Sequence, residues 1–342
     1  MKAARFHEYG GAEVMRYDDA PDPTPGPGEV LIRMRACALN HVDIDIRDGT
    51  SRLAIDLPHT LGFEFAGEIV SLGDGVDDWS EGDRVAPLSQ LHCSKCRWCA
   101  KAQHQHCEQL TMFGIQIPGG YAELVVAPAW ALIAVPDHVP FEHAASVQAV
   151  FGTGWHALTK RAHITEGDWV LINAAASGVG TAAIQIARLL GGRVIASASS
   201  EEKLARAREL GAEATVNYAT EDLTERVREI TDGHGAAVVY ESVGGELLEK
   251  SIAAMDTFGQ LVLVGCHAGE VVPVDFIEMF RHEWTLLGAA RATEDEFRHM
   301  MTLVADGRLT PVIADTFPLS KAADAHRFME SRKHHGKIVL VP

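Results

Sequence analysis

The sequence predicts an α/β protein in which a β-rich domain accompanies a second domain with a doubly wound parallel sheet. Residues 1–150 contain short β-like segments that glycine and proline separate. After residue 150, strand-like and helix-like segments alternate strictly. This alternation is typical of a parallel sheet with helices on both faces, because each connection between parallel strands must cross back over the sheet.

The β-rich part follows a turn-forming stretch at 22–28, in which prolines fix φ and glycines relax it. Its β-like segments recur between further turns, as expected for a small barrel-like domain. The predicted strands are residues 30–34, 68–72, 84–86 and 122–126.

The second part contains apolar strands and two well-defined helices. Gly191 and Gly211 follow these helices and predict left-handed residues at their C-termini. Residues 291–342 return to the style of the first part, so we expect domains at 1–150 and 151–290 and a return segment at 291–342. The predicted strands are 169–174, 193–198, 215–216, 237–241 and 260–265, and the predicted helices are 179–190 and 201–210.

Composition excludes several functions. The formal net charge of −17 repels phosphate backbones and argues against nucleic-acid binding as the main role. No apolar run approaches the roughly 18 residues that a membrane-spanning helix needs. The segment after Met1 lacks the apolar stretch of a signal peptide. We therefore expect a cytoplasmic protein with a small-molecule substrate and neither a nucleic-acid nor a membrane partner.

Four of the six cysteines have the spacing C-x2-C-x2-C-x7-C. Such clustering in a chain without an export signal favours metal over disulfides. Four thiolates fill a tetrahedral zinc site and leave no position for water, so we expect one structural zinc in a lobe at 90–110. Free thiols or adventitious metal binding are the alternatives, and His92, His104 or His106 could replace a ligand. The predicted ligands are Cys93, Cys96, Cys99 and Cys107.

A turn of small residues follows the strand at 169–174 and opens a helix. Of the three glycines in the usual dinucleotide fingerprint, only the last is matched, by Gly180. Small residues still allow the backbone to approach a pyrophosphate at the helix N-terminus, although a plain tight turn would also explain them. The predicted cofactor-binding residues of this turn are Ser177, Gly178, Val179 and Gly180.

The end of the next strand indicates which dinucleotide is bound. An acidic residue there would bind ribose hydroxyls and favour NADH, whereas the chain has Ser199 and, further on, Lys203. A hydroxyl and an ammonium suit a 2′-phosphate, so NADPH is favoured over NADH. The alternative is that Lys203 only pairs with a glutamate on its own helix.

These motifs and several further stretches together resemble the zinc-type alcohol dehydrogenase and quinone oxidoreductase family of the medium-chain dehydrogenase/reductase superfamily. The resemblance implies a GroES-like catalytic domain built from both chain ends around a Rossmann NADP-binding domain. It also implies a homodimer or homotetramer. The matching stretches are residues 1–8, 28–30, 62–67, 82–85, 119–123, 177–180 and 336–337, with the four cysteines.

The resemblance places the catalytic-zinc ligands of these alcohol dehydrogenases at Cys37, Phe63 and Ala149. Phenylalanine and alanine cannot coordinate zinc, and Cys37 with Glu64 alone would hold it poorly. We expect the catalytic zinc to be lost, unless His41, Asp43 or His92 substitutes as a ligand.

Zinc-free members of the family reduce polarised C=C bonds in quinones, enones, enals or enoyl thioesters with NADPH. The resemblance places Asn40 and Asp43 in a catalytic element near the nicotinamide, and we expect His41 to be the proton donor, unless it is an ordinary loop histidine. Two alternatives stay open: a zinc-dependent alcohol dehydrogenase with unusual ligands, and an NADPH-binding sensor or structural protein with little turnover. The resemblance adds four cofactor-binding residues, Thr153, Tyr218, Gly265 and Lys337, the last as a pyrophosphate-binding cation.

Overall fold

The computed structural model describes residues 1–342 and divides into two compact units. The first, which we call the β-rich unit, comprises Met1–Ala149 and Thr293–Pro342. The second, the parallel-sheet unit, comprises Val150–Ala292. No helix in either unit has both the length and the apolar character that crossing a bilayer requires.

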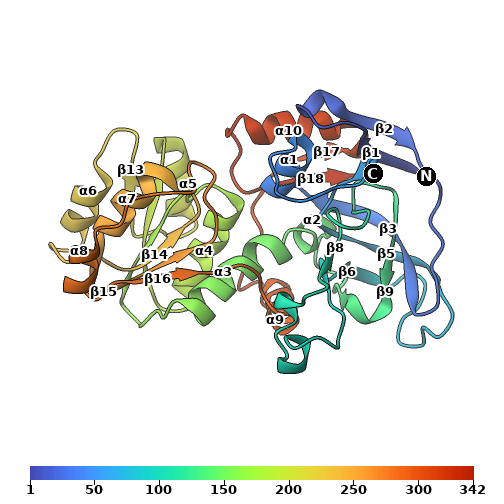
Figure 1. The fold of residues 1–342 in the computed structure, drawn as a ribbon, viewed down its shortest axis with the longest axis horizontal. Helices are drawn as coiled ribbons and strands as arrows, with labels where there is room; N and C mark the ends of the chain where they lie inside the picture. Colours follow the sequence, from blue (N-terminus) through green and yellow to red (C-terminus); the bar gives the residue numbers. More distant parts are fainter. The chain divides into compact units, whose positions relative to one another are not determined.

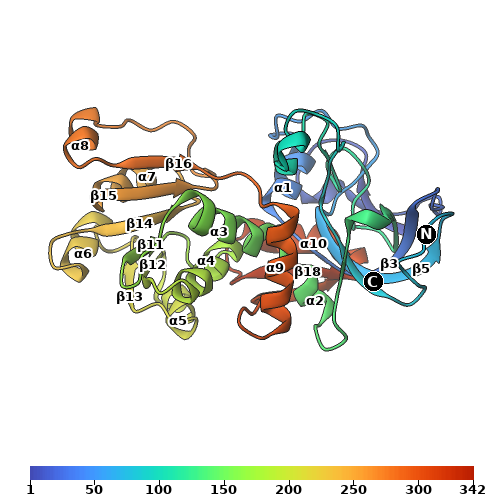
Figure 2. The same ribbon diagram turned by 90° about the horizontal axis from the view of Figure 1, so that it is seen from below.

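The parallel-sheet unit is built on six parallel strands in the order β13-β12-β11-β14-β15-β16 (Figure 2). The order reverses between β11 and β14, which is the doubly wound arrangement, so the expected fold class is confirmed. The strands are β11 (Trp169–Ile172), β12 (Arg193–Ala198), β13 (Ala214–Asn217), β14 (Ala236–Glu241), β15 (Met255–Leu263) and β16 (Thr285–Gly288).

Helices connect these strands, and apolar side chains account for their packing. Val170, Leu171 and Ile172 of β11 are fully buried, as a strand with helices on both faces requires. Gly191 and Gly211 have φ of 87° and 99°, which confirms the predicted left-handed residues after two helices. The helices are α3 (Thr153–His156), α4 (Gly178–Leu189), α5 (Glu201–Glu209), α6 (Leu223–Ile230), α7 (Gly245–Ala253) and α8 (Phe276–Arg281).

Some predicted strand limits in this unit are wrong. The strand expected at 169–174 ends at Ile172, because Ala174 has φ of 48° and already belongs to the turn before α4. The strand expected at 260–265 runs from Met255 to Leu263, and its start was hidden by Phe258, which has φ of 62°, and by the glycine that follows it. The edge strand β16 was missed because it has only four residues, which are largely exposed.

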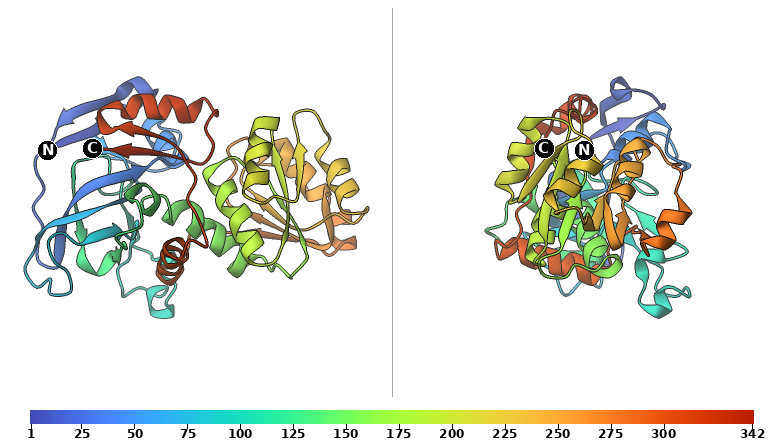
Figure 3. Two further views of the ribbon diagram at one scale, coloured as in Figure 1. Left: turned by 180° about the vertical axis from the view of Figure 1, so that it is seen from behind. Right: turned by 90° about the vertical axis from the view of Figure 1, so that its left-hand side faces the viewer.

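The β-rich unit contains a seven-stranded sheet in the order β10-β6-β5-β3-β18-β17, with β9 also paired to β3. Strand β18, from the end of the chain, pairs antiparallel with β3, so the red C-terminal and blue N-terminal segments lie side by side (Figure 1). Both chain termini belong to this unit (Figure 3). The strands of this sheet are β3 (Glu29–Ala38), β5 (Glu64–Leu72), β6 (Arg84–Pro87), β9 (Leu124–Pro128), β10 (Leu132–Ala134), β17 (Ile313–Pro318) and β18 (Lys337–Val341).

Smaller elements complete the β-rich unit. Their strands form one three-stranded sheet and one antiparallel two-stranded sheet. The strands are β1 (Lys2–Phe6), β2 (Met15–Asp19), β4 (His59–Thr60), β7 (Gln90–Leu91) and β8 (Thr111–Met112), and the α-helices are α1 (His41–Asp48), α2 (Phe141–Ala144), α9 (Glu294–Ala305) and α10 (Ala322–Glu330).

The turn between β11 and α4 has no room for a side chain at Gly180. A Cβ there would lie 2.3 Å from the backbone oxygen of Ala174. We expect Gly180→Ala to lower the free energy of unfolding of the parallel-sheet unit by about 1–3 kcal/mol, because the backbone of the turn must move. Thermal unfolding measures this. Gly288→Ala is the control, since nothing lies within 4 Å of its Cβ position, and an equal effect of both changes would contradict the steric argument.

Candidate functional site

A buried ion pair joins the first residues of two strands in the β-rich unit. Glu64 begins β5 and Lys337 begins β18, and both strands flank β3 in the sheet. The two side chains are 1% and 5% exposed, and Lys337 Nζ donates to Glu64 Oε1 at 2.7 Å. It also donates to Leu39 O at 2.6 Å and to Asn40 Oδ1 at 2.8 Å. All three N–H groups of the ammonium are therefore satisfied.

The carboxylate of Glu64 is equally well held. Its Oε1 accepts a second hydrogen bond, from Asn40 Nδ2 at 3.2 Å, and its Oε2 accepts from the backbone N–H of Ala149 at 2.9 Å. The expected contact between Lys337 and a cofactor pyrophosphate stays a prediction. In this structure its ammonium donates all three hydrogen bonds to residues of the β-rich unit.

The three positions that the resemblance assigned to zinc ligands surround this pair. Cys37 is fully buried, and its Sγ donates to the backbone oxygen of Glu64 at 3.2 Å. Burial raises the pKa of the Cys37 thiol well above its usual value, and the nearby carboxylates of Asp43 and Glu64 act in the same direction. Phe63 packs against the apolar core of the unit. Ala149 contributes only its backbone N–H.

Asn40, His41 and Asp43 lie at the start of α1. Asn40 is the N-cap, and its backbone N–H donates to Asp43 Oδ2 at 2.8 Å. Asp43 Oδ1 accepts from the backbone N–H of Gly62 at 3.3 Å. Asp43 is 1% exposed, and loss of water on burial raises its pKa to about 7 against the opposing effect of these two N–H groups. Asp43 thus fastens the start of α1 to the segment before Glu64, while His41 is half-buried.

The predicted dinucleotide turn caps α4. Ser177 is the N-cap, and its Oγ accepts from the backbone N–H of Gly180 at 3.0 Å. Gly178, Val179 and Gly180 form the first turn of the helix. The turn therefore offers backbone N–H groups at a helix N-terminus, which is the arrangement that binds a pyrophosphate.

Other predicted cofactor residues follow the carboxyl ends of the parallel strands. Ser199 comes directly after β12 and Tyr218 directly after β13, and the last residues of these strands are paired in register. Ser200 caps α5 and accepts from the backbone N–H of Lys203 at 3.4 Å. Gly265 lies beyond β15, where a Cβ would be 3.2 Å from Ser242 O.

Ligands of doubly wound folds bind at this edge of the sheet. Thr153 begins α3. All of these cofactor contacts stay predictions.

Sequence reasoning missed a buried polar network under the same edge. Glu241, at the end of β14, is fully buried and accepts hydrogen bonds from Gly244 N at 3.0 Å and Ser251 Oγ at 3.2 Å. Asn173, directly after β11, donates to Glu241 and, at 2.6 Å, to Ser251 Oγ. The network fixes the ends of β11 and β14. The signal in the sequence was a glutamate directly after a run of apolar residues in a strand.

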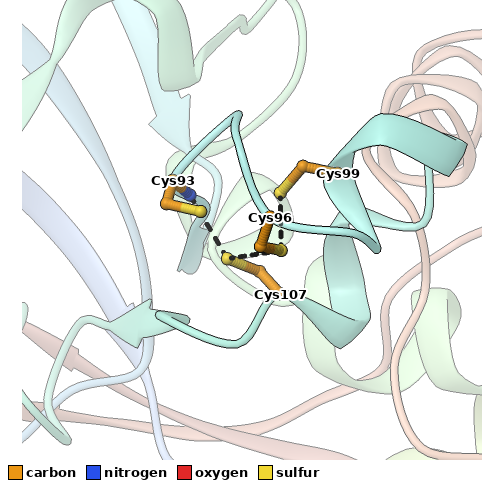
Figure 4. A group of neighbouring side chains, drawn as sticks. All are labelled: Cys93, Cys96, Cys99 and Cys107. Carbon is orange, nitrogen blue, oxygen red and sulfur yellow. Dashed lines mark hydrogen bonds between the residues drawn. The ribbon is translucent and has the colours of Figure 1, made fainter.

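The four cysteines predicted as zinc ligands converge (Figure 4). Their sulfur atoms all lie within 4.8 Å of one another, with Cys96 Sγ 3.5 Å from Cys99 Sγ and 3.9 Å from Cys107 Sγ. Tetrahedral zinc with Zn–S bonds of about 2.3 Å requires sulfur separations of about 3.8 Å.

Backbone N–H groups around the cluster favour thiolates. Those of Cys93 and Gln109 lie 3.3 and 3.4 Å from Cys107 Sγ. Those of Cys99 and Glu108 lower the pKa of Cys96 to about 6, whereas burial raises the pKa of Cys99 to about 12. These four residues fit a structural zinc, and none of the nearby histidines is needed as a ligand.

Comparison with known proteins matches both parts of the chain to dehydrogenase domains. The family model described as an alcohol dehydrogenase GroES-like domain matches residues 26–137, and that described as a zinc-binding dehydrogenase matches residues 178–306. A 2-haloacrylate reductase of a Burkholderia species is 32% identical over 100% of this chain and 99% of its own. A quinone oxidoreductase of Pseudomonas aeruginosa is 34% identical over the same shares.

Solved structures agree with these relatives. The structure of an NAD-dependent alcohol dehydrogenase covers 100% of both chains with a TM-score of 0.96 and 38% identity. A mycobacterial protein complexed with NADPH covers 100% of both chains with a TM-score of 0.83 and 31% identity. The chain is therefore an oxidoreductase that belongs to the zinc-type alcohol dehydrogenase and quinone oxidoreductase family of the medium-chain dehydrogenase/reductase superfamily.

Proposed function

We propose that this oxidoreductase uses NADPH to reduce C=C bonds conjugated to a carbonyl group, without a catalytic zinc. One observation carries the proposal: the ammonium of Lys337 occupies the surroundings of Glu64 with all three of its N–H groups bonded. A fixed cation thus compensates the carboxylate that remains from the family's zinc site.

The residues around Lys337 do not fit a catalytic zinc. Zinc binds thiolate, imidazole or carboxylate ligands, and three protein ligands are usual in a catalytic site. Cys37 is a buried thiol that donates a hydrogen bond to a backbone oxygen, and Phe63 and Ala149 offer no ligand atom. Asp43 is not a substitute, because both of its oxygens accept backbone N–H groups.

The chemistry follows from the missing Lewis acid. Alcohol oxidation by this family relies on a metal to lower the pKa of the bound alcohol. When bound, NADPH would supply the hydride for the β-carbon of a conjugated acceptor, and the charge left on the carbonyl oxygen would need hydrogen-bond or proton donors from this chain.

Within the segment from Asn40 to Asp43, hydrogen bonds to the backbone engage the side chains of Asn40 and Asp43. Asn40 uses its amide on Ala38 O and Glu64, so it positions rather than donates. Asp43 likewise holds the backbone. His41, half-buried at the first position of α1, is the group we assign as proton donor.

The relatives support a conjugated substrate. A 2-haloacrylate has a C=C bond conjugated to a carboxylate, and a quinone has C=C bonds conjugated to carbonyls, and enzymes named for both are about one-third identical to this chain. The second candidate is a dehydrogenase of alcohols, which the structural neighbour with 38% identity favours.

A panel of acceptors tests the proposal. We expect NADPH absorbance at its reduced-nicotinamide band to fall with quinones, enones, enals or enoyl thioesters, and His41→Gln to lower kcat by about 100-fold or more, the usual contribution of a general acid. His163→Gln, an exposed histidine of the parallel-sheet unit, is the control. Oxidation of simple alcohols in preference to all these reductions, with zinc lost in Cys37→Ser, would establish the second candidate instead.

The cofactor preference has its own test. A carboxylate after β12 would repel a 2′-phosphate and bind ribose hydroxyls. We expect Ser199→Asp to lower kcat/KM for NADPH roughly tenfold or more relative to NADH, because like charges in contact cost several kcal/mol. Thr257→Asp is the control: it adds the same charge at an exposed position of β15, and kcat/KM should stay unchanged for both cofactors. Equal use of both cofactors by the unchanged protein would contradict the role of Ser199 and Lys203.

The ion pair is testable through stability. We expect Lys337→Met to lower the free energy of unfolding by about 3–5 kcal/mol, because it leaves Glu64 as an uncompensated buried charge. Adding Glu64→Gln should recover much of this loss. Urea denaturation measures both variants. Arg206→Met, which breaks an exposed pair with Glu209, should cost less than about 1 kcal/mol. An equally small effect of Lys337→Met would show that the buried pair is not needed.

A further inference from the structure

Two histidines and a glutamate meet on the β-rich unit beside the cysteine cluster. The ligand atoms of His92, His104 and Glu294 all lie within 4.8 Å of one another, and all three residues are half-buried. This group is separate from the cluster of four cysteines. They come from three separate places in the sequence, and only the fold brings them together.

The two histidines are placed by the cysteine lobe itself. His92 directly precedes Cys93, and His104 opens the turn His104–His106 that leads into Cys107. Their rings stack with centroids 3.9 Å apart and planes 22° apart. Trp130 packs on the His92 ring with centroids 4.6 Å apart. A folded cysteine cluster therefore holds both imidazoles next to each other before any further ligand arrives.

We assign Nε2 of His92 to a metal ion, because its Nδ1 has a hydroxyl partner. Ser94 Oγ lies 3.1 Å from His92 Nδ1. When the hydroxyl accepts the Nδ1 proton, Nε2 carries a free lone pair. A metal-ligating histidine almost always has its other nitrogen fixed in this way.

An arginine on the same helix orients the carboxylate of Glu294. Glu294 is the first residue of α9, and Arg298 one turn later donates to its Oε1 from Nε at 3.2 Å and from Nη2 at 2.8 Å. Both contacts fall on the same oxygen. Oε2 thus keeps its lone pairs for a cation, and the arginine limits the rotation of the carboxylate.

We propose that His92, His104 and Glu294 form a second metal site, which binds a divalent ion of the zinc class. Two imidazoles and one carboxylate are a known ligand set for zinc, and three protein ligands leave a fourth position open to water or an anion. Nitrogen atoms on a tetrahedral zinc lie about 3.3 Å apart, so binding tilts the two rings out of their stacked arrangement until the ion lies in the plane of each. The bound ion links the cysteine lobe to α9. It differs in this from the closed four-sulfur site, which links only residues of the lobe.

Zinc stoichiometry tests the site. The holoprotein is equilibrated with zinc, freed of loosely bound ions, and its zinc content measured by elemental analysis. We expect two zinc ions per chain in the unchanged protein, and one in His104→Ala and in Glu294→Gln. His106→Ala, in the same turn but outside the cluster, should keep two. The retained single ion in the first two variants reports an intact cysteine lobe.

Cobalt separates the two kinds of site by spectroscopy. The first equivalent of Co²⁺ should produce strong thiolate-to-metal charge-transfer absorption, and the second should add only weak d–d absorption. In Ser94→Ala the second equivalent should bind about tenfold or more weakly, the usual effect of losing the group that orients a ligand.

One zinc per chain in the unchanged protein would overturn the second site, as would a second ion that survives both His104→Ala and Glu294→Gln. A second ion lost only in Cys37→Ser would lie at Glu64. That result would overturn the second site and also the zinc-free reaction proposed above.

Discussion

The pairing of β18 with β3 is the constraint on which the candidate site depends. It carries Lys337 from the end of the chain to Glu64, Leu39 and Asn40 near its beginning. A buried ammonium and a buried carboxylate are each costly, and the pair is tolerable because every donor and both carboxylate oxygens have partners. The sheet thus holds a polar site that neither chain end could form alone.

Hydrogen bonds connect this ion pair to the start of α1 and to the segment before Glu64. Asn40 contacts both charges, and it also caps α1. Asp43 then joins the start of that helix to Gly62, two residues before Glu64. Gly62 has φ of 106°, and a Cβ there would lie 2.6 Å from the backbone nitrogen of Gly120, so no other residue fits this close approach. These backbone contacts set the position of the main chain at His41.

The parts that could be predicted from the sequence are those with local signals. Strand and helix alternation indicated the parallel sheet, Gly191 and Gly211 indicated helix ends, and cysteine spacing indicated a cluster that does converge. Contacts between distant residues left no such signal. Nothing local in the sequence indicated that Lys337, which the resemblance assigned to the cofactor, pairs with Glu64, and Glu294 lies far from His92 and His104 in the chain. Periodicity predicts which face a residue occupies, but long-range polar partners depend on how the finished sheets meet.

The cation beside Glu64 is the ammonium of Lys337, and this limits the chemistry that the site supports. A zinc ion can exchange a water for a substrate oxygen, whereas the ammonium of Lys337 has three donors that are all bonded to protein oxygens. It can neutralise Glu64, but it cannot coordinate an alcohol and lower its pKa. Charge on a substrate oxygen must then be met by hydrogen bonding and proton transfer, which suits an enolate formed during reduction better than an alkoxide formed before oxidation. The proposed reduction of conjugated acceptors therefore accords with a fixed cation beside Glu64.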